Sequence, residues 1–187
     1  VWWATIGTTG QTVATPFSTS LVSVEPTLPS EIRITSLLSS SAYLKPSRGL
    51  TVTYSFPGAT SIWFPNDYDP GQGGSGEPDD LEYRGLSTAE QANAVKVFAE
   101  WAKVANIKLS KVADSSSVVG DIRVAYTNVN TDPEDDGSTL AYAYLPGETP
   151  SNSDIWLGHD AFSAGEDLAP GTLSGHTLLH EIGHALG

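Results

Sequence analysis

The sequence has 187 residues, which suits one domain, and its formal net charge of −13 repels nucleic-acid phosphates and anionic lipid headgroups. We therefore expect no nucleic-acid partner. The lack of cysteine excludes disulfides, a thiol nucleophile and thiolate metal sites. No apolar run approaches the roughly 20 residues of a membrane-spanning helix. The start at Val1-Trp2-Trp3 shows no signal peptide, and without any Met we expect the native start to be missing.

The first third of the chain is loosely patterned. Residues 1–30 are rich in Thr, Ser and Pro, which indicates an N-terminal lead or pro-segment. Ile32–Tyr43 fits either a short helix or a strand, and the pattern does not separate them. Leu50–Phe56 alternates apolar and polar residues and predicts a strand, with a second short strand at Ser61–Phe64. A Gly/Pro/Asp loop follows at Asn66–Asp80.

The clearest helix begins after a capping box, Ser87-Thr88-Ala89-Glu90, and contains no Gly or Pro as far as about Asn106. Apolar residues at positions i, i+3, i+4 and i+7 predict one buried stripe along this helix. The residues of the predicted stripe are Val95, Phe98, Ala99 and Ala102.

Several strands and a last helix are predicted in the second half. The first two strands alternate like half-buried strands, and an acidic turn at Asn130–Gly137 follows them. This order of elements predicts an α+β domain with a twisted mixed β-sheet that carries helices. The predicted strands are Ile107–Val112, Asp121–Tyr126, Thr139–Leu145 and Asp154–Leu157, and the final helix is Leu178–Leu186.

The final helix contains His180-Glu181-Ile182-Gly183-His184, which matches the pattern H-E-x-x-H. Residues i and i+4 share one helix face, so both imidazoles can reach one metal ion at the roughly 2.0–2.1 Å of a zinc–nitrogen bond. Glu181 lies beside the first ligand, where it can take a proton from an activated water instead of binding the metal.

The alternative reading of the motif is an ordinary surface helix that happens to carry two histidines. Apolar residues surround the motif, as expected for a buried helix that presents ligands to a cleft, and this favours the metal site. These apolar residues are Leu178, Leu179, Ile182 and Leu186.

The run HEIGHALG resembles the metzincin pattern H-E-x-x-H-x-x-G, with Gly187 as its glycine, where the backbone turns out of the helix. The resemblance implies a zinc endopeptidase with His180 and His184 as zinc ligands and Glu181 as general base. In the family, a third zinc-binding His follows three residues later and a Met-turn follows further on. Both lie beyond Gly187.

Other segments are similar to the serralysin branch of peptidase family M10. LTVTYSF resembles its first sheet strand, and STAEQANAVKVFAEWAKVANIKL resembles its long first helix and next strand. STLAYAYLPG and SDIWL resemble its edge strand and downstream segment. The resemblance implies that residues 31–187 are the N-terminal part of a metzincin-like catalytic domain. It also implies a secreted, extracellular protein with a calcium-binding repeat domain further along.

Two further histidines are candidates for metal ligands. His176 precedes His180 by four residues, but three ligands at i, i+4 and i+8 span about 12 Å of helix axis, too far for one tetrahedral ion. We expect His176 to be a helix-start residue or a residue that braces a ligand. His159 follows a predicted strand in a Gly/Asp loop, and we expect it to be exposed to solvent. Matrix metalloproteinases bind a second zinc through nearby histidines, whereas this sequence has Tyr142 and Tyr144 at the edge strand.

Acidic loops offer candidate calcium sites, because Ca²⁺ takes several oxygen ligands on flexible loops. Asp132, Asp135 and Asp136 precede a glycine where related proteases hold calcium, and Asp67 and Asp69 lie in a Gly-rich loop. The alternative is that these loops are simply solvated. Zn²⁺ is thus the expected metal, with Ca²⁺ as a second candidate.

The sequence predicts an enzyme that hydrolyses peptide bonds, with a protein or peptide substrate bound extended along the edge strand at Ala141–Leu145. Glu181 would take a proton from water and deliver it to the leaving amine. The 187 residues alone, with two protein ligands, are expected to bind zinc weakly and to be inactive. The alternative is a non-catalytic metzincin-like module that serves binding or assembly in a larger secreted or surface protein.

Overall fold

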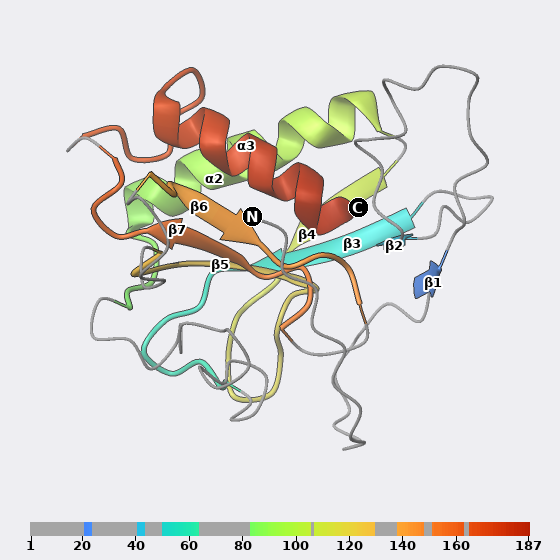
Figure 1. Ribbon diagram of the computed structural model, residues 1–187. Helices are drawn as coiled ribbons and strands as arrows, with labels where there is room; N and C mark the ends of the chain where they lie inside the picture. Colours follow the sequence, from blue (N-terminus) through green and yellow to red (C-terminus); the bar gives the residue numbers. More distant parts are fainter. Residues whose placement is uncertain are drawn as a thin grey trace.

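A computed structural model describes eight stretches of the chain: 21–23, 41–43, 50–63, 83–105, 107–129, 138–147, 151–162 and 165–187. Within them the chain forms seven strands and two helices (Figure 1). The strands are β1 (Leu21–Ser23), β2 (Ser41–Tyr43), β3 (Leu50–Ser55), β4 (Ile107–Lys111), β5 (Ile122–Thr127), β6 (Ala141–Ala143) and β7 (Ile155–Gly158). The helices are α2 (Thr88–Val104) and α3 (Leu173–Leu186).

The central element is a five-stranded mixed sheet with the order β4-β3-β5-β7-β6. The neighbours β4, β3, β5 and β7 are parallel, whereas β6 runs antiparallel to β7. The registers pair Leu50 with Ile107, Val124 with Ile155, and Ala143 with Ile155. The predicted α+β class with a mixed sheet is confirmed, and β6 stands at one edge of the sheet.

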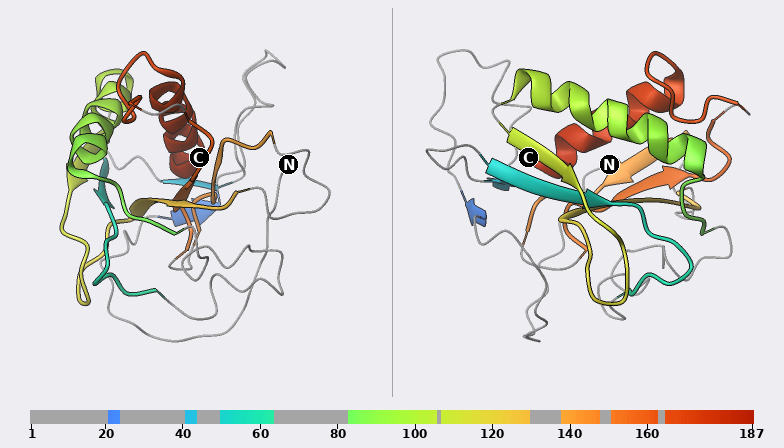
Figure 2. Two further views of the ribbon diagram at one scale, coloured as in Figure 1. Left: turned by 90° about the vertical axis from the view of Figure 1, so that its left-hand side faces the viewer. Right: turned by 180° about the vertical axis from the view of Figure 1, so that it is seen from behind.

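Both helices lie side by side on the same face of this sheet, as the two rotated views make clear (Figure 2). Helix α2 contacts β4, and α3 contacts β6, β7 and α2. The main core fills the space between helices and sheet, with Phe98 of α2, Val124 and Leu157 of the sheet, and Leu178 and Ile182 of α3 all fully buried. Burial of these side chains fixes where α3 lies over β6 and β7.

Helix α2 begins as the sequence predicts. The Ser87 hydroxyl accepts a hydrogen bond from the Glu90 N–H at 3.2 Å, and the Ser87 N–H donates to the Glu90 carboxylate at 2.7 Å. This capping box satisfies two of the N–H groups that a helix start leaves without partners. The helix ends at Val104, two residues before the predicted end.

The predicted buried stripe of α2 was wrong except at Phe98. Val95 is 37% exposed, and Ala99 and Ala102 also face solvent. The face that packs is displaced by one position, with the same spacing of i, i+3, i+4 and i+7, because the bulky side chains determine which face turns inward. It consists of Ala94, Val97 and Phe98, which are buried, and Trp101, which packs against the core.

Strand β5 also departs from expectation, since all its residues are buried instead of alternating. It lies in the middle of the sheet, so its helix-facing side chains join the main core. On the opposite face Ala125 and Trp156 of β7 form a second cluster, against which Trp63, Tyr83 and Tyr142 pack. A strand covered on both faces loses the alternating pattern.

Other predicted elements were close to those observed. The strand at Asp154–Leu157 is shifted by one residue to β7, and the strand at Thr139–Leu145 is shortened to β6. The end of Ile32–Tyr43 pairs as β2 with β1, and residues 61–63 form no strand.

No helix in the described part of the chain has the length and apolar character needed to cross a membrane.

Several sequence predictions fall largely outside the described residues. They are the N-terminal lead at 1–30 apart from β1, most of Ile32–Tyr43, the loop at Asn66–Asp80 and the acidic turn at Asn130–Gly137.

A buried ion pair joins β5 to the loop after β4. Arg123 donates to both carboxylate oxygens of Asp114 at 3.0 Å, and the two side chains are 2% and 1% exposed. Ser55 at the end of β3 donates to the same carboxylate at 2.6 Å, and the guanidinium lies 3.7 Å above the Trp63 ring. A charged pair this deeply buried is tolerated because its polar atoms have partners.

Removing the carboxylate should therefore be costly. Asp114→Ala is expected to lower the free energy of unfolding by about 3–5 kcal/mol, because the buried Arg123 charge loses its partner. Glu100→Ala, which breaks the exposed pair with Lys103, should cost less than about 1 kcal/mol. Urea unfolding of both variants measures the difference, and equal losses would contradict the account.

A second polar cluster ties the start of α2 to β5. Arg84 donates to both oxygens of Glu90 at 3.0 Å, and the Tyr126 hydroxyl donates to Glu90 at 2.9 Å. Burial raises the pKa of Glu90, but hydrogen bonds from Arg84, Ser87 and Tyr126 outweigh it and lower the pKa to about 2. Glu90 therefore binds protons less readily in the folded state than in the unfolded state.

The lowered pKa of Glu90 predicts that the free energy of unfolding depends on pH. A lowered folded-state pKa contributes stability above the unfolded value of 4.5, and this is lost as the pH falls toward about 2. Glu90→Gln should reduce stability by about 3 kcal/mol at neutral pH and flatten the pH dependence between those values. Chemical unfolding of both proteins from pH 6 to about pH 2 tests this. Parallel curves for the two proteins would show that Glu90 does not carry the effect.

Candidate metal centre

Helix α3 carries the H-E-x-x-H motif, and both of its ends are capped. Thr172 is the N-cap and accepts from the Gly175 N–H at 3.1 Å, while the Glu166 carboxylate accepts from the Ser174 N–H at 2.8 Å. Gly187 ends the helix with a φ of 94°, a conformation that favours glycine. Gly187 has the positive φ that the predicted turn needs, whereas the helix begins five residues before the predicted start at Leu178.

The two histidines of the motif converge on one point beside α3. The Nε2 atoms of His180 and His184 lie 2.9 Å apart, and the rings meet edge to face with centroids 4.6 Å apart. Two nitrogens bound to a tetrahedral zinc ion at 2.0–2.1 Å would be separated by about 3.3 Å. The observed separation is close to this value, so the pair fits a zinc ion with little movement.

The electrostatics favour metal binding by the pair. Burial lowers the pKa of His184, and the neighbouring His180 lowers it further. A lowered pKa keeps the imidazole neutral, which is the form that donates a lone pair to a metal. Within the described ranges no group of three or more His, Asp or Glu side chains gathers around an ion-sized site. Catalytic zinc sites use three protein ligands, so this pair alone would not make a complete catalytic site.

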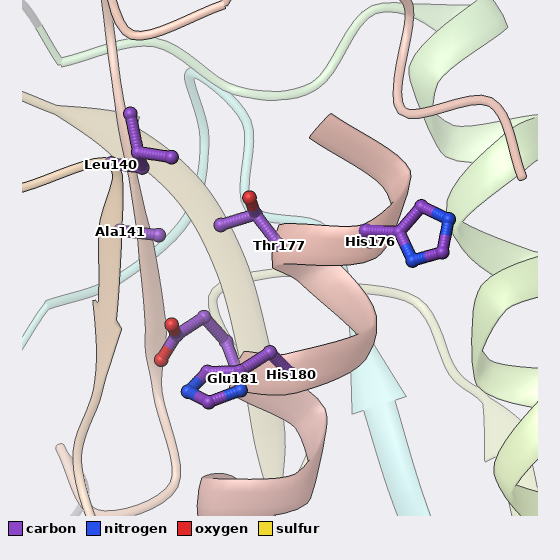
Figure 3. A pocket seen from close by; sticks show the side chains of 6 residues that line it. All are labelled: Leu140, Ala141, His176, Thr177, His180 and Glu181. Atoms are coloured by element: carbon purple, nitrogen blue, oxygen red, sulfur yellow. The ribbon is translucent and has the colours of Figure 1, made fainter. Parts of the chain in front are cut away.

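Glu181 lies on the inner side of the same turn. It is only 6% exposed, and its carboxylate extends toward the segment that contains Leu140 and Ala141 (Figure 3). Burial raises the pKa of Glu181 to about 7. A carboxyl group with a pKa near neutrality can both accept and release a proton at neutral pH.

An open pocket of about 370 Å³ lies between α3 and the edge strand β6. Ala141 and Ala143 of β6 pack against the main core, and Ala141 also lines the pocket. Thr177 uses its hydroxyl to donate to the Leu173 carbonyl at 3.0 Å within the helix. The pocket is lined by Leu140, Ala141, His176, Thr177, His180 and Glu181 (Figure 3).

The structure separates the other two histidines from the converging pair. His176 is exposed at the rim of the pocket, and its ring points away from His180 and Glu181 (Figure 3). His159 lies on the surface after β7 and is paired with Asp160 at 3.0 Å, so its predicted exposure is confirmed. The candidate calcium ligands lie outside the described residues, namely Asp67, Asp69, Asp132, Asp135 and Asp136.

Two pocket residues were not singled out from the sequence. Thr177 precedes His180 by three positions, so helical spacing alone places it on nearly the same face. Leu140 directly precedes β6, and only the pairing of β6 with β7 brings it beside α3. Helix periodicity would therefore have found Thr177, whereas Leu140 depends on tertiary structure.

A mixed sheet covered on one face by two helices, one of them bearing H-E-x-x-H, defines an α+β domain of the metzincin type. The model of the matrixin family (peptidase family M10) matches residues 80–187, and the chain belongs to this family.

The chain is also similar to Serralysin A and Serralysin C of Dickeya chrysanthemi, with 32% and 31% identity over 104 residues. Each match covers 54% of this chain and 21% of the relative, so the chain matches about a fifth of the length of these relatives. The predicted serralysin-like assignment is confirmed.

The geometry predicts different effects for the three histidines of α3. In the full-length protein, His180→Ala and His184→Ala should abolish stoichiometric zinc binding, because each removes one of the converging nitrogens. His176→Ala should keep stoichiometric zinc and weaken its binding by no more than about 10–100-fold, the effect of losing a ligand-bracing group. Zinc titration of the three variants measures this. Complete zinc loss in His176→Ala would show that His176 is a ligand.

Proposed function

We propose that this chain forms part of the catalytic domain of a zinc-dependent endopeptidase. The proposal is carried by the convergence of the His180 and His184 Nε2 atoms, 2.9 Å apart, beside the buried carboxyl group of Glu181. Membership of the matrixin family and similarity to two serralysins support the same activity.

His180 and His184 are the proposed zinc ligands, since their nitrogens approach one point at nearly the required separation. The metzincin pattern supplies the third ligand from a histidine three residues after Gly187. When bound there, zinc would act as a Lewis acid toward the scissile carbonyl and promote the ionisation of water. The neutral form of His184, favoured by its lowered pKa, suits this role.

Glu181 is the proposed general base. Its carboxylate lies in the pocket next to the histidine pair, where it accepts the proton of the attacking water as the oxygen approaches the peptide carbonyl. It then delivers that proton to the amine that leaves. Burial keeps its pKa near neutrality, which makes both transfers accessible in the same pH range.

The proposed substrate is a protein or peptide that binds in an extended conformation along β6. This strand is at the edge of the sheet order and forms one wall of the pocket through Ala141. Main-chain pairing with an edge strand would place the peptide across the pocket, close to Glu181. Because such pairing uses the backbone, it tolerates many substrate sequences.

The proposed setting is extracellular, with a secreted enzyme acting on extracellular proteins. The formal net charge of −13 disfavours nucleic acid as a partner. Calcium in the acidic loops and a calcium-binding repeat domain elsewhere in the protein remain part of this proposal, because both accompany the serralysin resemblance. A non-catalytic binding module is the alternative to be tested.

Replacing the base should separate chemistry from metal binding. In the full-length protein, Glu181→Gln keeps the side-chain shape but cannot accept the proton, so turnover of casein should fall by about 10²–10⁴-fold or more. Zinc content should stay at the wild-type level. Glu100→Gln, an exposed carboxylate on α2, is the control and should leave turnover unchanged.

Two outcomes would contradict the proposal. Activity within a few-fold of wild type in zinc-loaded Glu181→Gln would remove Glu181 from the role of base. A zinc-loaded wild-type protein that cleaves no protein substrate would favour the non-catalytic module.

A further inference from the structure

The indole of Trp101 packs on the turn of α3 that carries the histidine pair. Trp101 lies in the last turn of α2, and its Nε1–H donates to the Leu179 carbonyl at 2.9 Å. Leu179 directly precedes His180. A helix carbonyl has a second lone pair, so it can accept this bond without giving up its place in the helix.

The same indole also contacts the other end of that turn, at Gly183. A Cβ atom added at Gly183 would lie 2.9 Å from Trp101 Cζ2 and 3.5 Å from its Cη2, so the ring occupies the space where other residues carry a side chain. Gly183 directly precedes His184. Trp101 therefore touches α3 at two points four residues apart, each next to one of the two histidines.

The indole contacts a stripe of α3 that lies beside the histidine face. Successive residues of an α-helix are turned by about 100°, so Leu179 and Gly183 lie on a stripe about 100° from that of His180 and His184. The indole thus packs beside the histidine face without covering it. It holds the backbone of the turn while the imidazole of His180 remains open to the pocket that Figure 3 shows.

We propose that Trp101 is a positioning residue for the metal centre, a role that rests on the proposed function of the histidine pair. Its hydrogen bond and ring contact fix the rise of the turn from Leu179 to Gly183, and with it the separation of the two nitrogens. They also prevent α3 from sliding along its axis, or rotating about it, relative to α2. Metal sites require their ligands to be held within about 0.5 Å of the productive geometry.

The first test uses Trp101→Phe, which keeps an aromatic ring but removes the Nε1–H donor and the outer ring atoms. In the full-length protein the zinc dissociation constant should rise by about 10–100-fold, the effect of losing a group that orients metal ligands. Competition with a chromophoric chelator measures it. The absorption spectrum of the cobalt-substituted protein should change as well, because it reports the geometry of the ligands.

Phe98→Leu is the matched control, because Phe98 lies one turn earlier on α2 and stacks on Tyr54 of β3 with the ring centroids 3.9 Å apart. Both variants should lower the melting temperature of the metal-free protein. Only Trp101→Phe should raise the zinc dissociation constant by more than about 3-fold. Equal zinc dissociation constants for the two variants would mean that Trp101 acts through general stability, which overturns the proposal.

A second variant approaches the same contact from α3. Gly183→Ala places a methyl group against the indole, so it should raise the zinc dissociation constant by about 10-fold or more when Trp101 is present. In the Trp101→Phe background the added methyl finds space, and the effect of Gly183→Ala should shrink to about 3-fold or less. An equal effect in both backgrounds would overturn the proposal.

These measurements separate the two levels of the account. If the wild-type full-length protein binds no stoichiometric zinc, the proposed function fails and the role of Trp101 fails with it. If the wild type binds zinc tightly and Trp101→Phe binds it within about 3-fold of the wild type, the proposed function stands and only the positioning role is overturned.

Discussion

The packing of α3 between α2 and the edge of the sheet is the constraint on which the rest of the structure depends. Leu178, Ile182 and Ala185 are fully buried against the main core, so the helix has one rotation at which its apolar face is satisfied. At that rotation His180 and His184 face outward together, while Glu181 points inward to the pocket beside β6. The geometry of the candidate site thus follows from burying one side of a helix.

The surrounding elements keep this helix in place. Helix α2 is anchored to β5 through Glu90 and Tyr126, and it reaches α3 through Trp101 at its other end. Within the sheet region, the buried ion pair of Arg123 and Asp114 connects β5 to the loop after β4. Charged groups so deeply buried are stable only with their partners, which makes these links specific to one arrangement. The site is therefore supported at a distance by polar contacts as well as by the core.

The local signals in the sequence predicted the parts of the fold that depend on local structure. The capping box at Ser87, the glycine at the end of α3 and the i, i+4 spacing of the histidines are all decided within one helical turn. The α+β class with a mixed sheet also followed from the order of elements, in which a strand, a long helix, several strands and a last helix succeed one another. The motif gave the identity of the candidate ligands and the base, while their roles remain predictions.

The remaining features depend on contacts between distant segments. The inward face of α2 was misplaced because several apolar stripes fit its sequence, and only the packing of Phe98 and Trp101 against other elements selects one. Burial of β5 on both faces requires the cluster around Trp156, which periodicity along one strand does not reveal. Trp101 meets Leu179 across 78 residues of sequence, so its contact with the histidine turn could be found only in the folded structure.

The central claim is that the two imidazoles of α3 bind one zinc ion while Glu181 remains free to move a proton. Crystals of the full-length protein with one equivalent of zinc, measured at the zinc absorption edge, test this most directly. We predict a single anomalous peak beside α3, roughly 2.0–2.1 Å from the Nε2 atoms of both His180 and His184, with the Glu181 carboxylate outside bonding distance. A peak bonded to Glu181 or His176 in place of either histidine, or no peak beside α3, would contradict the account.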